Sequence, residues 1–499
     1  MKKTELTVFV GLLTPFLLGA FVRLYGLEKY YFWADEAVVL LLSKDLSFNI
    51  LSHLRQEPHP PLYYFFLKAV LFVFGADHPL ALRSISILSG LLTIIAGYFL
   101  GEKLTSKRSV GVFVSFLIAT SPLCIEQSQL VRAYSLLLFW LFILFYYLTR
   151  EPFKKSSFWL SCLFLVLATV THFGSVVLFP ALSIVGLMKA GQLQENKRVY
   201  QTCWIALLVV CGCFVLIAKS VAPSNLVTGH IQGLYSGAGS SLNTALRETL
   251  KIWGGFYGNQ LRGIPLFALF SIFLGLIYLW RDKKFDLLLL FVGTYLTAFI
   301  FSLVGVYPFV SGRHSIVLLV PTLIPTLWLL NKTATKKEAL LVLAGALVFF
   351  QVRSPRRIFY PDEMRWSLGE GSPKMEDLFI VSRAFKSGRL EGQPVLMDWG
   401  KYVSVLLERK LEPKWAVFSV ANQPFESCSW GAFSEKETVC NCLRSVSNKR
   451  PPKKEILLMT AGRRETENVL AAVREEKNCG HREVSIPFNG PFSILSVVL

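Results

Sequence analysis

Two adjacent carboxylates, Asp35 and Glu36, follow Trp33 just beyond the first apolar run of the chain. A carboxylate at a membrane surface is suited to take a proton from an attacking hydroxyl group. Neighbouring side chains on a helix point in different directions, so we expect one acid to face a substrate and the other to contact a base or the backbone. The plainer alternative is a helix start, in which the acids cap the helix and occupy its first turn.

A histidine and two tyrosines open a later apolar stretch, in the order His59-Pro60-Pro61-Leu62-Tyr63-Tyr64. Proline is favoured in the first turn of a helix, and the free backbone N–H groups of that turn attract anions. The segment therefore offers a seat for an anion. Equally, the tyrosines can serve only to anchor a helix among lipid headgroups.

Basic residues also mark two turns between apolar runs. One turn follows Glu126 and contains Arg132 and Tyr134, and the other contains Arg313 and His314. Lone arginines at such places usually anchor a helix by reaching toward the headgroups. A ring of Arg and His beside lipid also suits a phosphate whose tail stays in the bilayer, because charge-assisted contacts hold phosphate oxygens well.

The segments that carry these residues have the composition of a membrane protein. Apolar residues make up 53% of the chain and the mean hydropathy is +0.48, which excludes an ordinary soluble domain. A spanning helix needs about 20 apolar residues. Runs of this kind predict about eleven transmembrane helices, near residues 6–26, 80–102, 110–125, 134–148, 158–171, 174–189, 201–219, 263–280, 285–304, 314–330 and 338–351.

Lysine and arginine collect in every second loop between these spans, for example Lys103, Lys107 and Arg108 in one loop and Arg281, Lys283 and Lys284 in another. Such loops face the cytoplasm, so we expect the N-terminus inside and the C-terminus outside. The alternation leaves no place for residues 61–75 as a span, and their reach of about 22 Å is short for one. We expect them to form a helix along the outer membrane face.

The tail from about residue 352 has a different pattern. Residues 394–399, 415–420, 455–460 and 492–498 read as strands, and residues 400–410 and 464–476 read as helices. The sequence thus predicts a transmembrane domain over residues 1–351 and a soluble periplasmic α/β domain over residues 352–499. An oxidising compartment would permit disulfides among the tail cysteines, with the pairing left open: Cys428, Cys440, Cys442 and Cys479.

The predicted topology places all of the clusters above on one outer rim, joined by Arg83 at the start of the second span and His172 at the end of the fifth. This arrangement collects acids and phosphate-binding bases on one side of the membrane. The net charge of +19 fits the distribution of basic loops, so no nucleic-acid partner is expected.

The ordered motifs resemble bacterial GT-C membrane glycosyltransferases of the family 39-like group, relatives of protein O-mannosyltransferases and of the lipid A aminoarabinose transferase. The resemblance covers roughly residues 5–330 and rests on short motifs: Trp33-x-Asp35-Glu36, His59-Pro60-Pro61-Leu62-Tyr63-Tyr64, Leu82-Arg83-Ser84, Ser128-Gln129-x-x-Arg132-x-Tyr134 and Arg313-His314. Two positions depart from the family's pattern. Leu130-Val131 stands where relatives often place an acid, and His314 stands where a tyrosine is common.

The resemblance implies a polytopic α-helical GT-C enzyme of the bacterial inner membrane that uses a polyprenyl-phosphate sugar and a still undefined acceptor. It implies Asp35 as the catalytic acid or base with Glu36 as its neighbour, and Glu126 is the nearest substitute for the missing acid. We expect direct displacement at the anomeric carbon, with no obligatory metal. Tyr63 and Tyr64 are candidates for the acceptor or sugar, and the candidates for the donor phosphate are His59, Arg83, Arg132, Tyr134, His172, Arg313 and His314.

A transporter or flippase of lipid-linked sugars is the main alternative, and a membrane receptor or assembly factor is a further one. A transporter should place polar residues or broken helices near the membrane midplane and show repeated halves. Here the polar groups are predicted at the rim, which favours an enzyme.

Overall fold

The computed structural model describes a helical part and five strands of the tail. The described residues are 3–25, 27, 32, 34–46, 54, 59–76, 78–194, 196–221, 242–256, 266–304, 307–333, 395–398, 425–428, 455–461, 483–488 and 492–498. The chain forms two compact units. The first comprises residues 1–27, 46–69 and 81–364, and the second comprises residues 28–45, 70–80 and 365–499. The predicted boundary at residue 351 lies outside the described residues.

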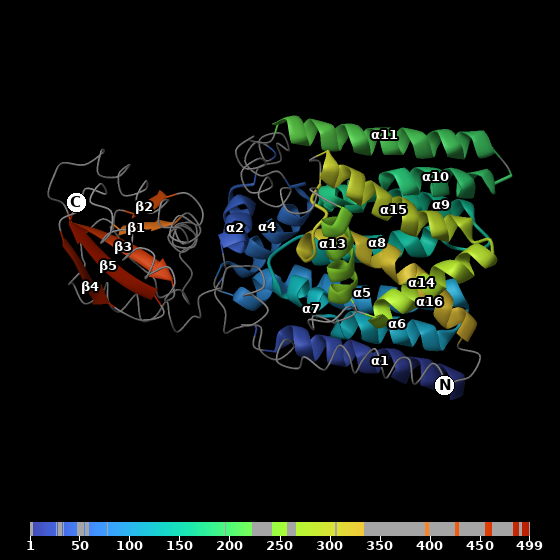
Figure 1. Ribbon diagram of the computed structural model, residues 1–499, viewed down its shortest axis with the longest axis horizontal. Helices are drawn as coiled ribbons and strands as arrows, with labels where there is room; N and C mark the ends of the chain where they lie inside the picture. The colour runs from blue at the N-terminus through green and yellow to red at the C-terminus, as the bar shows by residue number, and fades with distance from the viewer. Residues whose placement is uncertain are drawn as a thin grey trace. The chain divides into compact units, whose positions relative to one another are not determined.

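Helices fill the first unit, which Figure 1 shows as a bundle. They are α1 (Lys3–Leu24), α4 (Leu62–Phe74), α5 (Pro79–Thr105), α6 (Arg108–Thr120), α7 (Pro122–Gln129), α8 (Tyr134–Leu148), α9 (Lys155–Thr171), η2 (Phe173–Leu178), α10 (Phe179–Gly191), α11 (Lys197–Val221), α13 (Leu242–Phe256), α14 (Leu266–Arg281), α15 (Phe285–Leu303), η3 (Arg313–Leu318) and α16 (Leu319–Thr333).

Helices occur at ten of the eleven predicted spans, and the last, near 338–351, lies outside the described residues. By length and composition, five of the described helices can each cross a membrane, or six if the bent pair α6–α7 is one span. The predicted span 110–125 is this pair, which bends by 57°. Pro122 causes the break, because it has no N–H to donate and its ring crowds the preceding turn.

The predicted interfacial segment is the 13-residue helix α4. At about 1.5 Å per residue it reaches about 20 Å, which is less than the hydrocarbon thickness. Its last residues Phe72, Val73 and Phe74 are exposed large apolar side chains. The helix is confirmed, and its place along a membrane surface stays a prediction.

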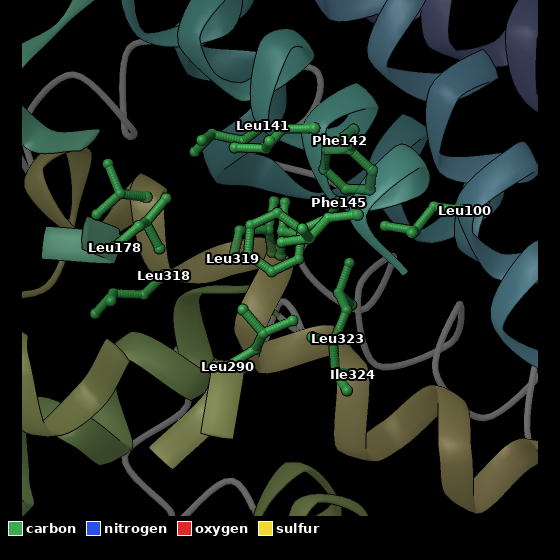
Figure 2. Packing of buried hydrophobic residues seen from close by; sticks show 14 of the residues in the cluster. Leu100, Leu141, Phe142, Phe145, Leu178, Leu290, Leu318, Leu319, Leu323 and Ile324 are labelled. Carbon is green, nitrogen blue, oxygen red and sulfur yellow. The ribbon is translucent and has the colours of Figure 1, made fainter. Parts of the chain in front are cut away.

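The core of the first unit is built around α16. In the most apolar window of η3–α16, 89% of the residues are buried, against 17% for α11, so α16 is central and α11 is peripheral. Figure 2 shows how Leu319, Leu323 and Ile324 of α16 pack against residues of α8 and α15. From Ile205 to Ile217 the exposed side chains of α11 are apolar, as a lipid-facing helix requires.

The lysine-rich loops meet at one end of the first unit, which we call the basic end. Lys189 Nζ lies 2.8 Å from Asp286 Oδ2 and 3.4 Å from Glu151 Oε1, and Lys284 Nζ lies 3.6 Å from Glu151 Oε2. Lys103 Nζ donates a 3.1 Å hydrogen bond to the backbone oxygen of Glu151. The basic loops therefore lie together, as their alternation along the sequence predicts.

The second unit contains α2 (Ala34–Asp45) and a five-stranded mixed sheet. The sheet order is β2-β1-β3-β5-β4, from β1 (Val395–Asp398), β2 (Phe425–Cys428), β3 (Glu455–Ala461), β4 (Glu483–Phe488) and β5 (Phe492–Val498). Strand β1 pairs in parallel with β2 and β3, whereas β5 pairs antiparallel with β3 and β4. Three predicted strands are confirmed. The predicted strand 415–420 and both tail helices lie outside the described residues.

Candidate active site

The two carboxylates occupy the first turn of α2, in the second unit. Asp35 is half-buried and Glu36 is fully buried, so the neighbouring acids face different surroundings, as expected for adjacent positions on a helix. Acidic residues in the first turn interact favourably with the helix dipole. This is the structural alternative that the sequence analysis left open for Asp35 and Glu36. The half-exposed Asp35 is the one of the two that an incoming hydroxyl can reach.

Four predicted phosphate-binding residues lie beside one another in the first unit. The guanidinium carbon of Arg132 lies 6.0 Å from the ring centroid of Tyr134. The Tyr134 ring lies 4.8 Å from the His172 ring, which lies 5.3 Å from the His59 ring. These residues come from the turn before α8, from α8 itself, from the turn after α9 and from the segment before α4. Distant parts of the sequence thus build one cluster.

A chain of hydroxyl groups holds Arg132 in this cluster. Ser86 Oγ donates to the backbone oxygen of Arg132 at 3.1 Å, so its only proton is used there. The hydroxyl of Tyr63, 2.9 Å from Ser86 Oγ, must then donate to Ser86. Tyr63 therefore supports Arg132, and Tyr64 is buried beside it. Arg83 is fully buried one turn before Ser86 on α5.

The turn before η3 carries Arg313 and His314, both half-buried. Gly312 adopts φ +102°, a conformation that favours glycine, and its backbone oxygen accepts a 2.8 Å hydrogen bond from Ser315 Oγ. The Tyr307 hydroxyl donates to the backbone oxygen of His314 at 2.8 Å. These backbone and hydroxyl bonds help to fix the turn that carries Arg313 and His314.

His172 lies in the turn between α9 and η2, and burial lowers its pKa well below the ordinary value. Electrostatic interactions with His59, His314, Arg132 and Arg313 act in the same direction, so all four groups lie near this ring. Gly174 N–H donates to His172 Nδ1 at 2.9 Å, so a neutral ring carries its proton on Nε2. Within the described residues, that buried Nε2 has no hydrogen-bond partner.

We call the cluster of His59, Arg132, Tyr134, His172, Arg313 and His314 the rim. The structure brings these six predicted residues together in the first unit. Glu126 is half-buried on α7, which packs against both η3 and α8. The described residues contain no group of three His, Cys, Asp or Glu side chains that could hold a metal ion.

Arg23, near the end of α1, is a residue that the sequence reasoning missed. Its side chain is fully buried, and Nη2 donates to the backbone oxygen of Ile118 at 3.1 Å. In an unbroken helix that oxygen would accept from the residue at position 122, but Pro122 has no N–H. Nη1 and Nε bind the backbone oxygen of Ala119 and the hydroxyl of Ser128, both at 3.1 Å. Arg23 thus replaces the backbone donor that is missing at the break between α6 and α7. A lone arginine inside an apolar run was the available signal.

Glu248 on α13 is a second missed residue. It is 7% exposed, and its Oε2 accepts a 3.0 Å hydrogen bond from the backbone N–H of Ser311, two residues before Arg313. Trp253 of the same helix donates to the Tyr295 hydroxyl at 2.8 Å, which anchors α13 on α15. Helix α13 therefore supports the turn that carries Arg313. No local pattern signals a contact between positions so far apart.

A known protein family matches part of the chain. Residues 58–216 match the family described as dolichyl-phosphate-mannose-protein mannosyltransferase. The match includes His59, Arg83, Arg132 and His172. A comparison with curated proteins finds no match.

Two solved structures have a similar fold. The crystal structure of ArnT from Cupriavidus metallidurans bound to undecaprenyl phosphate has a TM-score of 0.56 and 12% identity, covering 99% of this chain and 98% of that one. The crystal structure of the Archaeoglobus fulgidus oligosaccharyltransferase in complex with Zn and sulfate has a TM-score of 0.50 and 12% identity, covering 90% of this chain and 67% of that one. The fold is therefore of the GT-C type. Together with the matched family, it indicates a membrane glycosyltransferase, as the sequence motifs predict.

Proposed function

We propose that the protein transfers a sugar from a polyprenyl-phosphate donor to an acceptor hydroxyl group on the outer face of the bacterial inner membrane. The observation that carries the proposal is the rim, in which basic side chains from separate elements lie near the buried ring of His172. Basic side chains grouped in this way offer charge-assisted contacts to the oxygens of an anion. The chemically suited anion is the phosphate of a lipid whose tail remains among the apolar helices.

The contacts of the rim divide the work of binding phosphate. Arg132 and Arg313 supply forked guanidinium groups that bind two phosphate oxygens at once. His172 adds a neutral N–H donor at Nε2, whose direction is set by the bond from Gly174 to Nδ1. The ArnT structure that shares this fold holds undecaprenyl phosphate, which supports a polyprenyl phosphate as the lipid.

The reaction we propose is a direct displacement at the anomeric carbon. The acceptor oxygen forms a bond to that carbon while the bond from the carbon to the phosphate oxygen breaks, and the carboxylate of Asp35 takes the acceptor's proton. Polyprenyl phosphate leaves with the bonding electrons, and the arginines stabilise its growing negative charge. Glu36 and Glu126 are the reserve acids. The configuration at the anomeric carbon is inverted in a single displacement.

The same proposal places the basic end in the cytoplasm and the rim, Asp35 and the C-terminal domain outside. The support is the clustering of Lys103, Lys189 and Lys284 at one end of the bundle, since such loops remain inside. Tyr64, beside the Tyr63 that supports Arg132, is a further proposed contact for the sugar or the acceptor. The chemistry as written needs no obligatory metal.

The test is turnover by the purified protein in detergent or vesicles. Undecaprenyl-phosphate-linked hexoses and aminopentoses are supplied with envelope lipids and glycans as acceptors, with and without EDTA, and released undecaprenyl phosphate is measured by mass spectrometry. We expect release with one donor class, dependent on an acceptor and unchanged by EDTA. Movement of intact donor from one leaflet of the vesicle to the other without cleavage would instead identify a flippase and overturn the proposal.

A further inference from the structure

Polar side chains on the short helix α7 differ sharply in how they are satisfied. Ser128 Oγ accepts from Arg23 Nε at 3.1 Å and donates to the backbone oxygen of Cys124 at 2.5 Å. Gln129 Nε2 donates to the backbone oxygens of Val22 and Arg23 at 3.2 and 3.3 Å. These bonds attach one side of α7 to α1, so Ser128 and Gln129 have structural roles.

Gln127, between Glu126 and Ser128, has no such role. Its side chain is fully buried, and neither Nε2 nor Oε1 has a hydrogen-bond partner within the described part of the chain. A side-chain amide offers two donors on nitrogen and two lone pairs on oxygen. Leaving such groups buried and unsatisfied opposes folding, and native structures rarely do so without a reason.

The helix geometry directs Gln127 away from α1. Successive residues of a helix are about 100° apart, so Gln127 is about 100° from Ser128 and about 160° from Gln129. Helix α7 also lies against α5, where Gly90 faces Ser128, and against α8, α13 and η3. Helix α8 begins with Tyr134 and η3 begins with Arg313, which are both members of the rim. The unsatisfied amide therefore belongs to a helix that borders the rim.

We propose that Gln127 binds the sugar of the lipid-linked donor through two neighbouring hydroxyl groups. This inference rests on the proposed function. A phosphate group accepts hydrogen bonds, so it would use the amide nitrogen and leave the oxygen unsatisfied, and a polyprenyl chain would use neither. Neighbouring hydroxyl groups each donate and accept, and they match both ends of the amide. Gln127 thus recognises the sugar while the rim binds the phosphate.

The experiment compares Gln127→Met and Gln127→Leu with Gln129→Leu as a matched control on the same helix. Two quantities are measured for each purified protein: the thermal unfolding midpoint without ligand, and the affinities for undecaprenyl phosphate and for a panel of undecaprenyl-phosphate sugars carrying mannose, glucose, galactose or 4-aminoarabinose. In the unmodified protein we expect at least one sugar donor to bind about ten-fold more tightly than bare undecaprenyl phosphate, as a pair of neutral hydrogen bonds allows.

Both Gln127 variants should lose this ten-fold preference, keep their affinity for undecaprenyl phosphate and unfold at the same or a higher temperature. The Gln129→Leu control should unfold at a lower temperature and keep the preference. A preference that survives in both Gln127 variants, or that is absent from the unmodified protein, overturns the inference. So does a lowered unfolding temperature in both Gln127 variants, since it would show that the amide is satisfied by the protein. Failure of the unmodified protein to bind undecaprenyl phosphate at all would count instead against the proposed function.

Discussion

Charged side chains are arranged differently at the two ends of the same helices. At the basic end, Lys189 is almost fully buried, but it lies between the carboxylates of Asp286 and Glu151. At the rim, the other end of η2–α10 begins beside His172, which lies near several basic groups and has a buried Nε2 without a partner among the described residues. One end pairs its buried lysine with carboxylates, and the other brings basic side chains from separate elements together.

The helix η3–α16 repeats this contrast. Its last turn carries Lys332, whose Nζ lies 2.8 Å from Asp282 Oδ2, and Trp328 donates to the same oxygen at 2.7 Å. Lys332 and Trp328 hold the pKa of the Asp282 carboxyl below its usual value. The first turn of η3 instead carries Arg313 and His314, which add to the positive surroundings of His172. Balanced ion pairs indicate a structural role, whereas grouped basic side chains are the kind of arrangement that the proposed phosphate site requires.

The largest effect is expected from Asp35→Asn. Asparagine keeps nearly the same shape but cannot accept the acceptor's proton, so turnover of the undecaprenyl-phosphate sugar should fall by about 10² to 10⁴. Binding of the donor should survive, because the rim is untouched. Asp45→Asn, the same change at the exposed last residue of α2, is the matched control. Turnover within a few fold of normal would leave Asp35 as a first-turn acid and make Glu36 and Glu126 the next acids to test.

The next effect concerns the basic end. Lys189→Met leaves Asp286, which is 14% exposed, without its close cation and should lower the free energy of unfolding by about 3 kcal/mol. Adding Asp286→Leu removes the stranded charge and should restore most of the loss. Chemical unfolding in detergent measures both variants. If either variant that still folds binds undecaprenyl phosphate more weakly, the two ends are not independent and the comparison fails.

Arg313→Lys is the corresponding change at the rim. An ammonium keeps the positive charge but loses the fork that binds two phosphate oxygens, so we expect about 10- to 100-fold weaker binding of undecaprenyl phosphate, equivalent to one charge-assisted bond. Arg108→Lys is the control, because Arg108 is 55% exposed in a 3.4 Å pair with Glu102. Unfolding temperatures of both variants should stay close to normal. Equal affinities in the two variants would remove Arg313 from the phosphate site.

Much of the fold follows from local sequence patterns, and the exceptions have physical causes. Helices occur at ten of the predicted positions because each apolar run specifies its own helix, while five or six of the described helices are long and apolar enough to span. Strands β2 and β4 were missed, and both are edges of the sheet. Edge strands need not be apolar on both faces, and β4 contains Pro487, which is tolerated only where no hydrogen-bond donor is needed.

The contacts of the candidate site also include some that the sequence could predict and some that it could not. The membership of Arg132, Tyr134 and His172 in one cluster could be predicted, because the alternation of basic loops places their turns at one end. Asp35 and the cluster residues carry roles that remain proposals. The support of the α6–α7 break by Arg23 and the bond from Ser311 to Glu248 could not be predicted, since these contacts join residues far apart in the sequence. The unsatisfied amide of Gln127 is visible only when its neighbours are placed.

The smallest expected effect is a dependence of stability on pH that belongs to the rim. Burial, followed by the charges of His59, His314, Arg132 and Arg313, lowers the pKa of His172 in the folded protein. In the unfolded chain the pKa is about 6.5, so below that pH the unfolded state takes up a proton that the folded state does not. The free energy of unfolding should therefore decrease as pH falls from about 6.5 toward the lowered pKa, by at most about 1.4 kcal/mol per pH unit, and stay level above 6.5.

His172→Asn keeps an acceptor for Gly174 N–H but does not titrate, so subtracting its pH profile isolates this contribution. Saturating undecaprenyl phosphate should reduce the slope, because a negative group beside the ring favours the imidazolium. A slope that is unchanged in His172→Asn would show that another group causes it. A slope that is unaffected by undecaprenyl phosphate would mean that the phosphate does not bind beside His172.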